Sequence, residues 1–140
     1  VLAEPASPSY VRWALEQCGN PDDFHVAVFS VLCVDDDRAR AYRTMAPWLA
    51  SLLTDPHVGL RVLPFFDDLV ARHDTHGVSG LATMPSEWWS EIGPIGTADD
   101  AVAHVEALKA AGVQSIGMFP APVVETAMAQ VDDVLRIAAR

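Results

Sequence analysis

Polar and apolar positions along the chain predict helices that alternate with short apolar strands. Two apolar runs, 24–34 and 113–119, are rich in β-branched and aromatic residues and are bounded by turn residues, which favours strands. Because both runs are apolar at successive positions, we expect strands buried on both faces, as in a parallel sheet. Helical spacing of apolar residues predicts helices over about 8–18, 38–53 and 123–139.

The stretch from Gly96 to Pro122 shows this order most clearly. Thr97 is expected to cap a helix, with Asp100 three residues later completing a capping box. Gly112 is expected to end that helix in the left-handed conformation. A helix that turns on a glycine into a buried strand is one step of a parallel α/β fold.

The segment from about 54 to 95 is less regular, because prolines and glycines interrupt it repeatedly. We expect an irregular helical insertion here, with short helices near 63–71 and 86–91. Trp88 and Trp89 lie in the second of these helices. Neighbouring positions on a helix point about 100° apart, so one indole is expected to fill the core and the other to line a pocket or an interface.

Composition limits the classes of partner. The 140 residues make at most one domain, 1–140, and the net charge of −10 disfavours nucleic acid and anionic membrane surfaces. No apolar run approaches the roughly 20 residues of a membrane span. Cys18 and Cys33 lack metal-ligand spacing and are expected to be buried free thiols in a reducing cytoplasm. The chain begins at Val1, in what looks like the end of a strand, which favours a fragment or a processed product.

Two clusters have ligand-like composition. Asp35–Asp37 could suggest a metal site, but an acidic helix start explains this run without an ion. His73, Asp74 and His76 lack a helical histidine pair and a cysteine partner, so a solvated turn is favoured. A metal-dependent hydrolase that uses both clusters is the least favoured class.

Three segments together carry a family resemblance. They are Leu2–Pro5 followed by Ser7–Val11, Val28–Val34 followed by Asp35–Ala41, and Gly96–Pro120. In this order and spacing they resemble the C-terminal part of the luciferase-like monooxygenase and F420-dependent oxidoreductase family. The resemblance implies the last three βα units of a (β/α)8 TIM-type barrel, with the insertion at about 54–95. Such a barrel has about 250 residues or more, with its active site at the C-terminal ends of the strands.

The family resemblance also implies chemistry. We expect hydride transfer or monooxygenation on an organic substrate that the sequence does not identify, with F420 as cofactor and FMN as the alternative. Residues outside this chain would bind most of the cofactor, and no catalytic residue is assigned. The residues expected at the substrate- and cofactor-facing rim are Glu4, Pro5, Ser7, Trp88, Trp89, Phe119 and Pro120. Glu4 either faces the substrate or pairs with an arginine or a helix end, and Phe119 with Pro120 would form an apolar wall.

A second hypothesis from another class remains open. A stand-alone α/β module without catalytic activity would hide its open sheet edges by association. We therefore expect either a homo-oligomer or completion by a missing N-terminal part. The chain alone is expected to be inactive.

Overall fold

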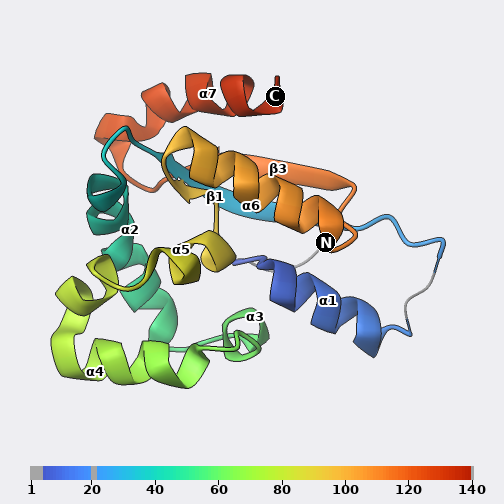
Figure 1. Ribbon diagram of the computed structural model, residues 1–140, viewed down its shortest axis with the longest axis horizontal. Coiled ribbons are helices and arrows are strands. Elements are labelled where there is room, and N and C mark those ends of the chain that lie inside the picture. Colours follow the sequence, from blue (N-terminus) through green and yellow to red (C-terminus); the bar gives the residue numbers. More distant parts are fainter. Residues whose placement is uncertain (1–4, 20–21, 140) are drawn as a thin grey trace.

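The computed structural model describes residues 5–19 and 22–139 (Figure 1). The strand expected at Val1–Ala3, and Glu4 with it, lie outside the described residues. The helices and strands in chain order are α1 (Pro8–Gln17), β1 (Ala27–Val34), α2 (Arg38–Leu53), α3 (Val58–Arg61), α4 (Phe66–Ala82), α5 (Ser86–Ile92), β2 (Ile95–Gly96), α6 (Ala98–Ala110), β3 (Ser115–Pro120) and α7 (Val124–Ala138).

The three strands form one parallel sheet in the order β2-β1-β3. Residues 27–32 of β1 pair with residues 115–120 of β3, whereas Cys33 and Val34 pair with Ile95 and Gly96 of β2. The expected α/β class with parallel strands is therefore confirmed. The barrel stays a prediction, because the described residues form an open sheet of three strands.

Helices cover the two faces of the sheet unequally. On one face, Val28 and Leu32 of β1 pack with Leu108 of α6 and Ile137 of α7. On the other face, Val31 and Cys33 belong to a large core with side chains of α2, α4 and α5. Figure 1 shows this division, with α7 on one side of the sheet and α2, α4 and α5 gathered on the other. The larger core reaches only the C-terminal half of its face.

Local sequence signals explain where the helices begin. The Ser7 hydroxyl accepts a hydrogen bond from the Tyr10 amide at 3.0 Å, and Pro8 occupies the first helical position, where its missing N–H costs nothing. Thr97 and Asp100 form the expected reciprocal capping box at the start of α6. Gly112 takes a φ of 104° just beyond that helix, as expected.

Three expectations were wrong. His73 and His76 lie within α4 rather than in a solvated turn. This helix is broken at Gly77, which has φ 59° and ψ −151°, and the chain then resumes a helical path. β3 is exposed or half-buried at every position rather than buried on both faces, since a single described strand pairs with it. Cys18 is exposed, and only Cys33 is a buried thiol.

Candidate functional site

The turn that follows β1 lies beside the end of β2, because the Asp35 amide donates to the Gly96 carbonyl at 2.9 Å. Asp35 accepts two hydrogen bonds from the Arg40 guanidinium, at 2.6 and 2.7 Å, and the Asp37 side chain caps α2 by accepting from the Ala39 amide. The hydrogen bond from Arg40 holds the pKa of Asp35 below its usual value. The aspartate run therefore shapes a turn and a helix start.

An ion pair ties the starts of α2 and α6 together. The Arg38 guanidinium donates to both carboxylate oxygens of Asp100, each at 2.8 Å, and Thr97 donates to the same carboxylate. Partial burial acts to raise the pKa of Asp100, but the hydrogen bonds from Arg38 and Thr97 outweigh it and hold that pKa below its usual value. Asp100 is therefore an ionised structural anchor rather than a proton donor.

A buried glutamine completes the end of β1. The pairing of β3 with β1 ends at Pro120 opposite Leu32, two residues before β1 itself ends at Val34. Gln130 of α7, only 3% exposed, accepts from the Val34 amide at 2.7 Å and donates to the Val34 carbonyl at 2.9 Å. The Gln130 amide thus takes the place of a strand partner and fixes α7 to the sheet.

An apolar surface is left uncovered by the described residues on the sheet face away from α6 and α7. Phe29 and Phe119 lie on this face and are 50% and 38% exposed. The Phe29 ring lies over Gly117, where an added Cβ would approach the ring to 2.5 Å. The glycine therefore lets one aromatic ring extend across the neighbouring strand. This face is the feature in the described residues best suited to contact a flat apolar ring.

The expected rim residues are distributed over the start of α1, helix α5 and the end of β3. Pro5 and Ser7 are buried, and Ser7 is used as a helix cap. Trp88 stacks on Phe65 with ring centroids 4.7 Å apart, whereas Trp89 is fully buried. The Trp89 indole therefore fills the core and has no surface to offer a ligand.

Phe119 and Pro120, which were expected to form an apolar wall, stand at the C-terminal end of β3. Phe119 is exposed there, and Pro120 is half-buried. Glu4 lies outside the described residues. The assignment of these residues to a rim stays a prediction.

The buried titratable groups are not poised for acid–base work on a ligand. Burial raises the pKa of the Cys33 thiol to about 11, so it is protonated and weakly nucleophilic near neutral pH. Burial also raises the pKa of Tyr42, whose ring stacks on Trp89. His104 is 1% exposed, and burial lowers its pKa, so it is a neutral core histidine whose Nδ1 bonds the Ser90 carbonyl at 2.7 Å. Among the described residues, no group of three or more potential ligands is arranged to hold a metal ion.

The sequence did not single out Phe29 or Gln130. Each sits within a long apolar pattern, where one more aromatic ring or one polar residue carries little signal. The alternation of side chains along β1 is the sequence signal that could have identified Phe29. Phe29 lies on the same face as Val31 and Cys33 but nearer the start of the strand.

No protein-family model matches the chain, and no curated protein matches it. In the described part of the chain, no helix has both the length and the apolar content that crossing a membrane requires.

Proposed function

We propose that this chain forms the C-terminal βα units of a luciferase-like (β/α)8 barrel, in an oxidoreductase that transfers hydride or oxygen to an organic substrate with F420, or alternatively FMN. The observation that carries the proposal is the uncovered aromatic face of Phe29 and Phe119. Parallel sheets are normally covered on both faces, and the inner face of a closed barrel is covered by side chains of the other strands.

The layering supports the same proposal. The crossover from β2 through α6 to β3 places α6 on one face of the sheet, and α7 returns to that face. Successive βα units of a barrel put their helices on the outer face in this way. The other face is covered near its C-terminal end by α2, α4 and α5, although α2 precedes the insertion expected at about 54–95. In a barrel this layer would stand over the mouth.

In this arrangement the described residues position a cofactor and exclude water. Phe119 at the end of β3 would contact an apolar face of the ring or of the substrate, while Arg38 and Asp100 hold the neighbouring loops in place. The cofactor supplies the hydride or oxygen chemistry.

A substitution of Phe29 tests whether this face is an interior surface. In a polypeptide of barrel size, Phe29→Asp buries an unpaired carboxylate and is expected to lower the free energy of unfolding by about 3–5 kcal/mol. Val78→Asp is the matched control, because Val78 is 42% exposed on α4, outside the sheet. We expect the control to change stability by about 0.5 kcal/mol or less. Equal effects of the two variants in urea denaturation would contradict an interior position for Phe29.

Cofactor binding tests the activity itself. A polypeptide of barrel size should bind F420, or FMN, with one site per chain when titrated by fluorescence. A protein that binds neither cofactor would rule out the oxidoreductase. A chain that instead forms a stable dimer in light scattering and binds no cofactor would support the non-catalytic module.

A further inference from the structure

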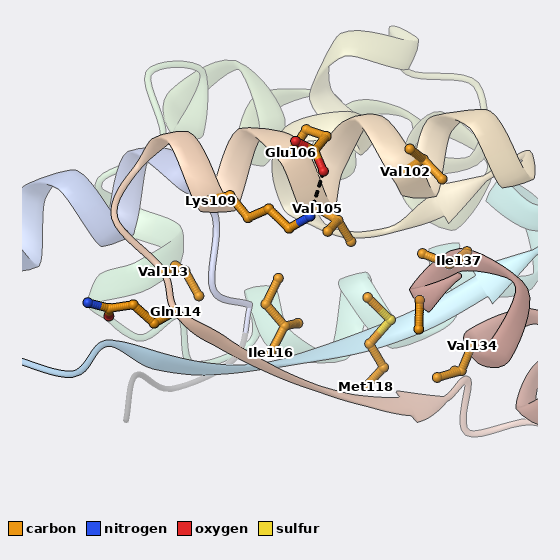
Figure 2. A pocket seen from close by; sticks show the side chains of 11 residues that line it. Val102, Val105, Glu106, Lys109, Val113, Gln114, Ile116, Met118, Val134 and Ile137 are labelled. Carbon is orange, nitrogen blue, oxygen red and sulfur yellow. Dashed lines mark hydrogen bonds and ion pairs between the residues drawn. The ribbon is translucent and has the colours of Figure 1, made fainter. Parts of the chain in front are cut away.

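A groove of about 280 Å³ lies between α6, β3 and the last turns of α7 (Figure 2). The side chains that line its interior are apolar: Val102, Val105, Val113, Ile116, Met118, Val134 and Ile137. The groove opens on the sheet face that α6 and α7 cover, opposite to Phe29 and Phe119. It is therefore independent of the proposed barrel interior and of any flavin or deazaflavin site.

The polar groups of the groove stand at its rim. The Lys109 ammonium pairs with Glu106 at 2.6 Å, and the two side chains are 58% and 63% exposed. Figure 2 shows the Lys109 side chain extending along the groove toward Val105. Gln114, the third polar lining residue, uses its amide to bond the backbone at Val26 and Phe24. Among the described residues that line the groove, Lys109 thus provides the single cationic group.

The charge at the rim selects the kind of ligand. Lys109 is the only lysine in a chain of net charge −10. Lys109 and Glu106 are both more than half exposed, so their ion pair contributes little free energy and a ligand carboxylate can replace Glu106 beside Lys109. The charge then orients the ligand, and the apolar interior supplies most of the affinity. The described side chains of the interior offer no hydrogen-bonding group, which suits an alkyl chain and disfavours a polar ligand body.

We propose that the groove binds a medium-chain fatty carboxylate, with its alkyl chain along the apolar interior and its carboxylate on the Lys109 ammonium. Decanoate is the probe, titrated into the protein below its micelle concentration and followed by chemical shifts of the groove methyl groups. Each methylene removed, from decanoate to octanoate and hexanoate, is expected to weaken binding about four-fold. Decanol and decyltrimethylammonium should bind more weakly than decanoate.

Three exposed variants test the role of Lys109. Lys109→Gln should reduce decanoate affinity to that of decanol, and Glu106→Gln should increase it, because the ammonium then has no competing carboxylate. Arg136→Gln is the matched control: it removes one positive charge from α7, where Arg136 is 75% exposed and pairs with Asp133. The control should leave decanoate affinity within about two-fold of the parent protein.

Several results would overturn this proposal. The first is that decanoate causes no chemical-shift change of the groove methyl groups. The second is that decanol or decyltrimethylammonium binds as tightly as decanoate. The third is that Lys109→Gln and Arg136→Gln lose equal decanoate affinity. None of them bears on F420 or FMN binding, so the two proposals fail separately.

Discussion

The Gln130 side-chain amide is expected to contribute substantially to the free energy of unfolding, because it pairs two backbone groups at the end of β1. Gln130→Leu keeps a similar side-chain size but removes both hydrogen bonds to Val34, of 2.7 and 2.9 Å. The Val34 amide and carbonyl, on a half-buried residue, would then lack partners. A buried polar group left unpaired costs about 1–3 kcal/mol. Two such groups, near the low end of this range, predict a loss of about 2–4 kcal/mol in the free energy of unfolding.

The assay is urea denaturation followed by far-ultraviolet circular dichroism, with Gln114→Leu as the matched control. Gln114 makes the same two-sided contact with the segment that leads into β1, at the Val26 amide and the Phe24 carbonyl, but in an exposed position. Water can replace its bonds, so we expect a loss of about 1 kcal/mol or less. A Gln130→Leu loss no larger than that of Gln114→Leu would refute the reasoning.

The charged variant Gln130→Glu adds a pH signature. One carboxylate oxygen can still accept from the Val34 amide, but the other would face the Val34 carbonyl and repel it. Protonation restores a donor, so the carboxyl introduced has a raised pKa in the folded protein. Its stability deficit relative to the parent should therefore shrink as the pH falls toward about 4. A deficit that does not change with pH would mean that the carbonyl contact contributes nothing.

Two further predictions concern the core. Burial lowers the pKa of His104, so at acidic pH the unfolded chain binds a proton that the folded chain does not. The free energy of unfolding should therefore be full above about pH 6.5 and fall below it by up to about 1.4 kcal/mol per pH unit. His104→Gln should remove this pH dependence in thermal denaturation. Trp89→Ala should cost about 3–5 kcal/mol in urea denaturation, because the indole is fully buried against Tyr42, whereas Trp88→Ala on the half-buried neighbour should cost clearly less. Equal losses at the two tryptophans would contradict the described packing.

Local signals made much of the fold predictable. Ser7, Thr97 and Gly112 specify helix ends through bonds within a few residues, so their effects do not depend on distant parts of the chain. The central place of β1 followed from its apolar residues on both faces, since a strand between two helix layers has no polar face.

Features that depend on distant contacts were not predictable in the same way. The Arg72 guanidinium donates to the carbonyls of Gly80 and Thr83, beyond the Gly77 break. These bonds link the two parts of α4 at a point where glycine predicts an end. β2 has two residues, too few for any periodic signal, and exists through its pairing with β1.

The candidate site was predictable only in its location. Parallel strands bring their C-terminal ends to one edge, so the positions of Asp35 and Phe119 followed from the two predicted strands. The strand positions did not predict which of the candidate side chains are exposed and which are buried. Trp88 and Trp89 illustrate the difference, because helical geometry separates the two indoles but does not say which one enters the core.

The measurement that most directly tests the barrel proposal is the intact mass of the native polypeptide, together with its N-terminal sequence. The proposal predicts a chain of about 250 residues or more, in which the present 15.1 kDa form the C-terminal part. A native polypeptide of 15.1 kDa would contradict it, because no further strands of the same chain could then cover Phe29 and Phe119.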